Sequence, residues 1–316
     1  MARPGPSYDF VLDLTKLLLN FWEIVEVSLK LLTDLSTPIM MGILLGGLYA
    51  LIALGLSLVF GVMKLINVAH GDLVLFSSYL AYAAMTMLGI DPIISLVIAI
   101  PLLFVMGFAI QKYLLGRAFA ISMEAPLIIA FGISLILQNF QQIVWSPMSR
   151  GLTTSYTLAS FGVGSIRVPL AYLLDFVAAL VVMLLLREFL SRTYLGKAIH
   201  AASQDRRAAQ LMGINTDRMY AFAFAISMAT AALAGVFLGL TFPFTPQSGV
   251  SFLIIAFGVV IIGGLGSMLG TFIGGMVLGL AQTLGGYFLG AAAQMLFAYS
   301  IVLIVLAVRP QGIFGR

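Results

Sequence analysis

Nine long apolar runs constrain the fold of this chain more than any other feature of its sequence. They fall at roughly 39–63, 72–88, 92–111, 125–145, 170–186, 219–241, 251–264, 267–286 and 291–308. A helix needs about 20 apolar residues to cross the core of a bilayer, and backbone in lipid must pair its own polar groups. The sequence therefore predicts an all-α polytopic membrane protein with eight or nine membrane segments. The run at 251–264 is short for a crossing and could be a half-helix that enters and returns.

The distribution of charge predicts how these segments are oriented. Hydrophobic residues make up 61% of the chain and charged residues only 9%. Loops rich in Lys and Arg stay on the cytoplasmic side, so Lys112 and Arg117 mark one inner loop, and Arg309 and Arg316 place the C-terminus inside. The pI of about 9.4 reflects this bias and does not indicate nucleic-acid binding, because no basic run interleaved with aromatic residues appears outside 187–218.

The first 38 residues form an N-terminal extension. From Asp9 to Asp34, eight polar residues recur in steps of three and four, which places them on one face of a helix. This pattern predicts an amphipathic helix in the membrane interface or along the outside of the bundle. A crossing is disfavoured, because ionisable side chains are costly in lipid. Thr37 and Pro38 fit the N-cap and the first position of the first true span.

A polar segment at 187–218, called the basic loop from here on, separates two apolar runs. It holds three acidic residues and six basic ones, namely Arg187, Arg192, Lys197, Arg206, Arg207 and Arg218. The excess of basic residues places the loop in the cytosol. Its core, Ser203 to Met212, predicts a short helix with Gly213 as the residue after its C-terminus. Such a helix could dock a soluble partner, although orientation alone also requires positively charged loops of this kind.

The remaining connections follow from that orientation. Counting back from the basic loop puts residues 88–91 outside, 64–71 inside and residue 38 outside. The long connection at 146–169 is rich in Ser, Thr and Gly and carries only two basic residues. It predicts an outer loop that could hold a small extramembrane element.

Two segments interrupt the apolar runs, one in each half of the chain, as expected of two pseudo-repeated halves. The first break is GVMKLINVAHGD at 61–72, and the second is GGLGSMLGTFIGG at 263–275. Non-helical backbone at membrane depth is tolerated only where protein buries it or water wets it, so we expect both breaks to approach each other along a substrate path. The side chains and glycines expected there are Asn67, His70, Asp72, Gly264, Gly266 and Ser267. A tight inner hairpin and GxxxG helix packing are the alternative interpretations.

Four amide side chains near the end of the fourth run allow two interpretations. Gln138, Asn139, Gln141 and Gln142 could line a path for a polar solute. They could equally bond across helices at the membrane interface, which the nearby Trp145 favours.

The sequence lacks the residue sets that catalysis or energy coupling require. It has no Gly-x-x-x-x-Gly-Lys-[Ser/Thr] segment and therefore no P-loop. It has no cysteine and only two histidines, which argues against a disulfide, a thiolate centre or a histidine-based metal site. Apart from Asp72, Asp91 and Asp175 near segment ends, no acid lies in a span, whereas ion-coupled transport usually leaves acids at mid-membrane. We therefore expect neither catalytic residues nor a cofactor or metal in this chain.

Four stretches resemble the permease subunits of ABC importers for branched-chain amino acids. They are GGLYALIALGLSLVFGVMKLINVAHGDLVLFSSYLAY (46–82), GKAIHAASQDRRAAQLMGIN (196–215), GVVIIGGLGSMLGTFIGG (258–275) and LAVRPQGIFG (306–315). The resemblance covers residues 40–316 nearly end to end, and only the N-terminal 35 residues depart from it. The AHGD form at 69–72 is similar to the H-type subunit of the leucine/isoleucine/valine system, whereas the M-type sister is expected to carry a LGHAAF-like version.

This resemblance implies a multi-pass transport subunit of the plasma (inner) membrane, with residues 39–316 as its transmembrane domain. An M-type permease chain would complete the channel, two ATPase subunits would bind ATP and Mg²⁺, and an external (periplasmic) binding protein would deliver the amino acid. The basic loop would be the coupling loop that docks on the ATPase. Its coupling residues would then be Asp205, Arg206, Ala208, Ala209, Leu211, Met212 and Gly213. Urea or short amides are alternative cargoes, since similar permeases carry them.

Two other classes of membrane protein remain as rivals. A stand-alone secondary transporter also uses paired broken helices, but the coupling-type loop and the lack of mid-membrane acids favour the ABC class. A membrane scaffold that transports nothing would have no need for two glycine-rich breaks.

Overall fold

The computed structural model describes residues 6–119, 121–122, 124–163 and 166–315, with side chains from residue 34 onward except at 163 and 166. The described residues are mostly helical, and the elements in chain order are α1 (Pro6–Met63), α2 (His70–Leu88), α3 (Leu96–Ala109), the π-helix η1 (Ile110–Leu115), α4 (Gly116–Ala118), α5 (Ala125–Trp145), β1 (Ser160–Val163), β2 (Ile166–Pro169), α6 (Leu170–Arg192), α7 (Tyr194–Gln204), α8 (Arg206–Leu211), α9 (Thr216–Thr241), α10 (Ser248–Gly263), α11 (Met268–Leu289), the 3-10 helix η2 (Ala291–Ala293) and α12 (Gln294–Val308).

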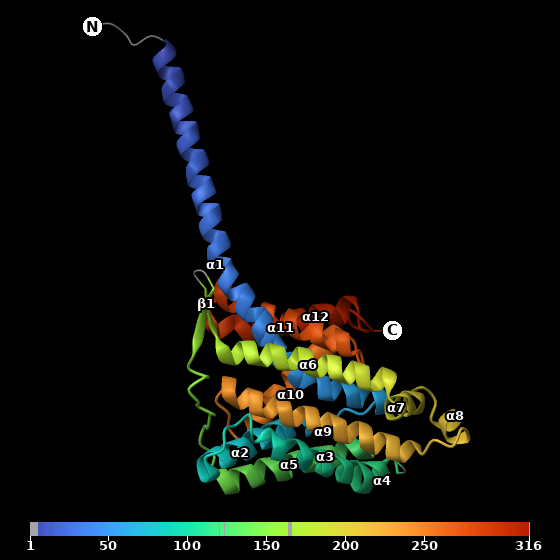
Figure 1. Cartoon of the computed structure of the whole chain (residues 1–316). Helices are drawn as coiled ribbons and strands as arrows, with labels where there is room; N and C mark the ends of the chain where they lie inside the picture. Colours follow the sequence, from blue (N-terminus) through green and yellow to red (C-terminus); the bar gives the residue numbers. More distant parts are fainter. Residues whose placement is uncertain (1–5, 120, 123, 164–165, 316) are drawn as a thin grey trace.

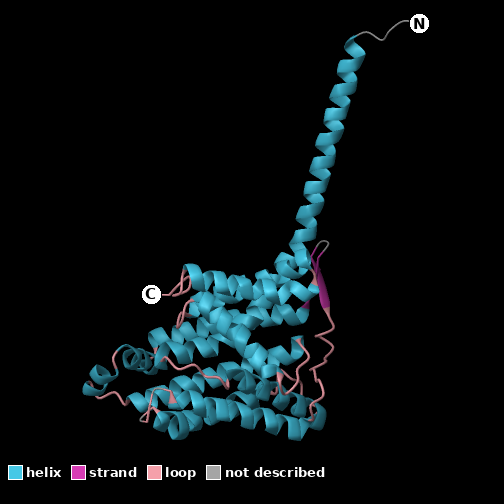
Figure 2. Ribbon diagram, turned by 180° about the vertical axis from the view of Figure 1, so that it is seen from behind, coloured by secondary structure: helices cyan, strands magenta, loops and turns pink. Residues whose placement is uncertain are grey.

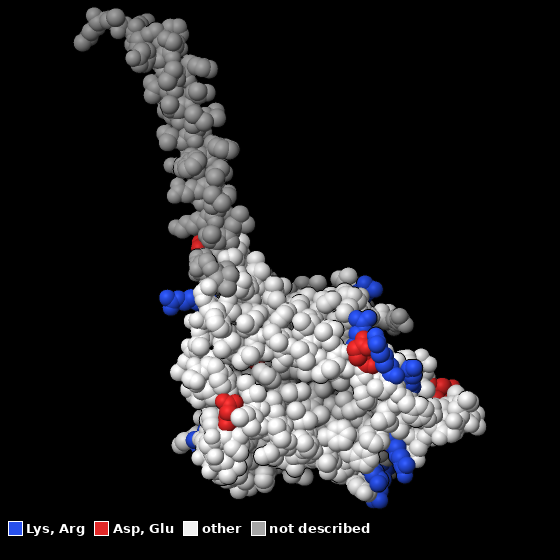
Figure 3. Space-filling view, in the orientation of Figure 1, with Lys and Arg blue, Asp and Glu red and all other residues white. Residues whose placement is uncertain are grey.

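The predicted polytopic all-α architecture is confirmed. Within the described part of the chain, eight helical segments are long and apolar enough to cross a membrane, and α3, η1 and α4 together form one of them. The remaining run, at 251–264, forms a shorter helix, α10, whose 16 residues span about 24 Å, less than the roughly 30 Å of a hydrocarbon core. Charged atoms gather towards two opposite ends of the bundle and leave an uncharged band between them (Figure 3).

The bundle has two distinct ends. Figure 1 shows α7, α8 and the C-terminus at one end, called the loop end here, and the strands β1 and β2 at the other, called the hairpin end. The reverse view shows the same separation (Figure 2). The strands form an antiparallel pair with Ser160 opposite Pro169. The small element expected in the connection at 146–169 is therefore this hairpin.

Helices α1 and α11 pack along one another. Their backbones touch, because a Cβ placed on Gly275 would lie 2.5 Å from the carbonyl oxygen of Gly46, and one on Gly46 would lie 2.5 Å from the Cα of Met276. Helix α9 packs on α1, α2 and α3. Small residues at helix contacts are typical of membrane bundles, where no hydrophobic force draws helices together.

The predicted helix boundary at Thr37 and Pro38 is wrong. Helix α1 runs without interruption from Pro6 to Met63 and contains Pro38 in its interior. A Thr-Pro pair suits a helix start, but a proline is also found inside long helices, where it costs one hydrogen bond and commonly causes a kink. Figure 1 shows the N-terminal half of α1 leaving the bundle across the direction of the neighbouring helices. The side chains that would form the amphipathic face lie outside the described residues, so the interfacial role stays a prediction.

The hairpin end is tied together by contacts between distant segments. Arg150 and Phe244 form a backbone bridge between the connection at 146–159 and the one between α9 and α10. Tyr156 donates a hydrogen bond from its hydroxyl to Asp91 Oδ1 (3.0 Å), and burial raises the pKa of Tyr156 to about 12. These contacts tie the connection at 146–159 to the segments that precede α3 and α10.

Candidate functional sites: the basic loop and the two helix breaks

The basic loop contains two helices and not the single helix predicted from Ser203 to Met212. Helix α7 ends at Gln204, and α8 begins at Arg206. Asp205 separates them because its carboxylate oxygen Oδ1 accepts hydrogen bonds from the backbone N–H groups of Arg207 (2.8 Å) and Ala208 (3.0 Å). An aspartate in this position caps the N-terminus of the next helix, which competes with continuing the previous one.

The predicted position of Gly213, as the residue after the C-terminus of the short helix, is confirmed by its backbone. Its φ is +81°, in the left-handed region that glycine adopts without a steric penalty. The turn is closed by two hydrogen bonds, from the Gly213 N–H to the Gln210 carbonyl and from the Ile214 N–H to the Ala209 carbonyl (both 3.0 Å). The chain therefore reverses after α8 and enters α9 directly.

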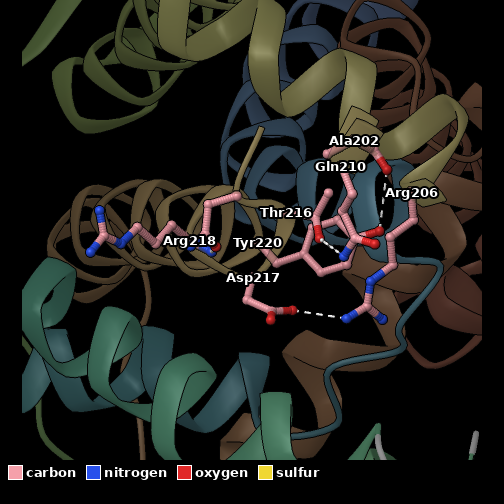
Figure 4. Close-up of polar contacts among 8 residues, drawn as sticks. Ala202, Arg206, Gln210, Thr216, Asp217, Arg218 and Tyr220 are labelled. Carbon is pink, nitrogen blue, oxygen red and sulfur yellow. Dashed lines mark hydrogen bonds and ion pairs between the residues drawn. The ribbon is translucent and has the colours of Figure 1, made fainter. Parts of the chain in front are cut away.

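Side chains hold the basic loop against the start of α9 (Figure 4). Arg206 pairs with Asp217 (2.8 Å) and lies over the ring of Tyr220 at 5.7 Å. The Gln210 amide donates to the Thr216 hydroxyl (2.9 Å). The Tyr220 hydroxyl donates to the carbonyl of Ala202 in α7 (3.2 Å). The sequence analysis did not predict these partners of Arg206 and Gln210. Contacts within this chain are enough to hold the loop in a folded conformation.

The tip of the basic loop exposes large apolar side chains. Leu211 and Met212, at the C-terminal end of α8, are 88% and 82% exposed, and α8 lies at the part of the loop farthest from the bundle (Figure 1). Among the seven predicted coupling residues, Ala209 is buried and the others are exposed. These two side chains are therefore available for contact with another chain.

The first break reaches the interior of the membrane segment. His70 donates from Nε2 to the carbonyl oxygen of Ile52 (2.8 Å). Ile52 lies eleven residues before the end of α1 at Met63, or about 16 Å along the helix axis. The chain between Met63 and His70 therefore turns back into the bundle, and α2 begins well inside it. Asn67 is buried there, and no described group bonds its Nδ2 atom.

Asp72 lies at this depth in a cluster of polar groups from α2 and α5. Ser134 donates to Asp72 Oδ2 (2.5 Å), and the Gln138 amide donates to Ser134 (3.2 Å). Gln141 donates to the backbone carbonyl of Asp72 (3.1 Å). The other carboxylate oxygen, Oδ1, is buried with no partner among the described residues. It lies against Gly249 near the start of α10, where a Cβ would clash with it. The serine was missed from the sequence, although the amide cluster of the fourth run points to it.

The remaining amides of α5 face outward. Asn139, Gln142 and Gln247 are exposed on a helix surface that is otherwise apolar. Gln247 precedes α10 and donates its amide to Gln142 Oε1 (3.2 Å). Polar side chains in membrane proteins usually face protein or water, so these amides suit either contact with another chain or the membrane interface.

The second break forms the turn between α10 and α11 at the loop end. Gly264 and Gly266 have φ values of +100° and +84°. Ser267 caps α11 by accepting a hydrogen bond from the Gly270 N–H (3.1 Å). The C-terminal tail covers the turn, since Phe314 donates its N–H to the Gly263 carbonyl (3.1 Å). Gly266 also borders a cavity of about 200 Å³ that extends to His200 and Ser203 of α7.

The two breaks meet at Gly61 and Gly266, where a Cβ placed on Gly61 would lie 2.8 Å from the Cα of Gly266, but the polar residues of the first break lie elsewhere on α1. His70 contacts α1 at Ile52, whereas Gly266 approaches the Cα of Gly61. Nine positions at about 100° per residue place Ile52 and Gly61 on opposite faces of α1. His70 and Gly266 therefore contact opposite faces of α1 at different depths. The spacing of residues within each break carries no information on which face of α1 it packs against.

Comparison with known proteins gives a consistent result over most of the chain. The family model described as "Branched-chain amino acid transport system / permease component" matches residues 39–306. The High-affinity branched-chain amino acid transport system permease protein BraD of Pseudomonas aeruginosa is 32% identical over 297 residues, with 87% of this chain and 94% of BraD covered. The corresponding LivH protein of Escherichia coli is 32% identical over 289 residues with the same coverage. The probable LivH permease of Methanocaldococcus jannaschii is 30% identical over 312 residues, with 90% and 95% covered.

Proposed function

Since the chain belongs to the family of permease components of branched-chain amino acid transport systems, we propose that it forms half of the membrane path of an ATP-driven importer for branched-chain or other hydrophobic amino acids. A second permease chain of the M-type completes the path, two ATPase subunits bind ATP and Mg²⁺, and an external binding protein delivers the amino acid. The match over 94% of BraD and LivH supports this assignment. The chain has no P-loop, so the ATP is bound by a partner.

The structure of the basic loop is the observation that best supports this proposal. Its preformed α8 presents Leu211 and Met212 to the outside of the bundle, which suits insertion of a short helix into a groove on an ATPase. Arg207 is exposed beside them and not in an ion pair with a described acid within 4 Å, so it can make charge-assisted bonds at the rim of that groove. The loop end then faces the cytosol together with the C-terminus, and the hairpin end faces the binding protein.

We place the substrate path along the face formed by α2, α5 and the start of α10. Asn67, His70 and Asp72 lie beneath this face, and the exposed amides Gln142 and Gln247 lie on it. In the assembly the second permease chain covers this face and leaves a polar interior. The buried carboxylate of Asp72 would attract the ammonium group of an amino acid, and the amides would hydrogen-bond its carboxylate. Transient contacts of this kind suit a path, because tight binding slows release.

The second break would serve as the inner mouth of the path. Gly264, Gly266 and Ser267 form a turn at the loop end, next to the cavity that α7 lines. Movement of the basic loop on an ATPase would therefore displace the turn between α10 and α11. The close backbone contact between Gly266 and Gly61 makes the position of this turn sensitive to α1 as well.

Reconstituted vesicles test the proposal. Uptake of radiolabelled leucine should require the ATPase subunits, the binding protein and ATP together. Because the chain has no cysteine of its own, His70→Cys and Gln142→Cys should react with a small water-soluble thiol reagent in the assembled complex. Val97→Cys is the matched control, since Val97 is exposed on the apolar side of α3 and should stay unlabelled. Full uptake without ATPase subunits would refute the assignment.

A further inference from the structure

A cavity of about 350 Å³ lies at the loop end, between the end of the third apolar segment and the C-terminal part of the basic loop. It is bounded by η1 and α4 on one side and by the start of α9 on the other. Its lining includes Gln111, Lys112, Arg117, Arg206, Asp217 and Arg218. We propose that this cavity binds the phosphate of an anionic phospholipid whose headgroup carries hydroxyl groups, such as phosphatidylglycerol.

The charge of the lining is strongly one-sided. Four of the lining residues are cations, and the lone acid among them, Asp217, is already paired with Arg206 at 2.8 Å. Lys112, Arg117 and Arg218 are exposed, and none forms an ion pair within 4 Å with an acid among the described residues. Three cations around one hollow repel each other, so a bound phosphate would stabilise this arrangement.

The π-helix carries one of these cations, Lys112, and Arg117 follows it in α4. Helix η1, at the end of the third apolar segment, widens the helix over six residues, a feature that is frequent at functional sites. The Lys112 ammonium lies over the ring of Phe108 at 5.9 Å and over the ring of Tyr113 at 5.1 Å. These aromatic contacts favour a fixed position for the ammonium group.

Gln111 supplies a second, independent indication of a ligand. Its side chain lines the cavity and is buried, and its Oε1 atom has no hydrogen-bond partner among the described residues. A buried acceptor without a partner is unusual in a folded protein. A phosphate oxygen cannot satisfy it, because both are acceptors. A hydroxyl group on the headgroup can donate to it, which is why we specify a headgroup such as glycerol.

The surroundings favour a lipid over free phosphate. Large apolar side chains are exposed along the same segment, at Leu102, Val105 and Leu114, and would contact acyl chains. Basic hollows between transmembrane helices on the cytoplasmic side are known to accept anionic headgroups. Placing the cavity in the inner leaflet rests on the proposed function, whereas binding itself does not.

A thermal-shift experiment tests the proposal without any transport assay. The full-length chain is purified with the subunits that accompany it, and the unfolding midpoint of this chain is followed as phosphatidylglycerol or phosphatidylcholine is added. Phosphatidylglycerol should raise the midpoint and phosphatidylcholine should not. The double substitution Lys112→Gln/Arg117→Gln should weaken the apparent affinity about 30-fold, from about 1 kcal/mol for each cation near an anionic lipid surface.

Matched controls distinguish lipid binding at this cavity from nonspecific attraction of anionic lipid to any basic side chain. Arg187→Gln/Arg192→Gln removes two cations elsewhere at the loop end and should leave the lipid effect intact. Gln111→Leu should abolish the preference for phosphatidylglycerol over phosphatidylmethanol, which has the same charge but no hydroxyl groups. Equal loss in both double variants, no loss in the cavity variant, or an equal shift with inorganic phosphate would each overturn the proposal. If the cavity variant does not fold, Lys112→Arg/Arg117→Lys keeps the charge and should retain binding. The Gln111→Leu variant then tests the proposal, because it should lose the preference for phosphatidylglycerol over phosphatidylmethanol.

Discussion

Replacing Asp205 tests whether the basic loop must be preformed in order to act. The carboxylate of Asp205 bonds the N–H groups of Arg207 and Ala208 at the start of α8, and loss of such a cap costs about 1 kcal/mol. Helix α8 has only six residues, and isolated helices this short are unstable in water. Asp205→Ala should therefore raise the population of the opened loop about fivefold, since 1.4 kcal/mol corresponds to a factor of ten.

The substitution Asp205→Asn is the matched control, because asparagine caps helices as well as aspartate does but carries no charge. Hydrogen exchange at the α8 amides should become about fivefold faster in the alanine variant and change little in the asparagine variant. Leucine uptake and transport-linked ATPase activity in reconstituted vesicles should follow the same order. Equal loss of transport in both variants would refute the capping argument and make the charge of Asp205 a direct contact with a partner.

Three further changes test other parts of the structure. Gly213→Val should open the end of α8, since a β-branched residue at a φ of +81° costs about 1–2 kcal/mol; hydrogen exchange there should accelerate, whereas Gly213→Asn should change little. Gly275→Ala should lower the thermal midpoint because the new Cβ meets the Gly46 carbonyl at 2.5 Å, while Gly286→Ala on the same helix, with its nearest neighbour at 3.5 Å, should be neutral. Deleting residues 1–35 should reduce stability or assembly of the complex, measured by co-purification, and leave the choice of substrate in uptake assays unchanged.

The membrane segments could be predicted from the sequence because lipid imposes one requirement on every crossing. An apolar run of sufficient length must be helical there, whatever lies around it. The boundary at Thr37 and Pro38 could not be predicted, because a threonine and a proline fit a helix start and a kinked interior almost equally well. The structure shows that Pro38 lies in a helix interior, because α1 continues on both sides of it.

The basic loop shows the same limit on a smaller scale. Its position and its final turn at Gly213 follow from local rules of charge and backbone conformation. The interruption at Asp205 depends on a side chain that can either continue a helix or cap the next one. The contacts that hold the loop, such as Arg206 with Asp217, join residues on different helices and leave no periodic signal.

The two breaks look alike in the sequence and differ in the structure because different segments satisfy their backbones. The second break lies at the loop end, where the C-terminal tail bonds the carbonyls of Ile262 and Gly263. The first break lies about 16 Å inside, where α1 accepts a bond from His70 and α5 supplies the Gln141 amide to the Asp72 carbonyl. Within the described part of the chain, polar atoms of Asn67 and Asp72 have no hydrogen-bond partner there, and burying such groups without a partner costs several kcal/mol. Water or a solute that enters from the exposed amides of α5 would relieve this cost, which supports the proposal that an amino acid binds at the first break during passage.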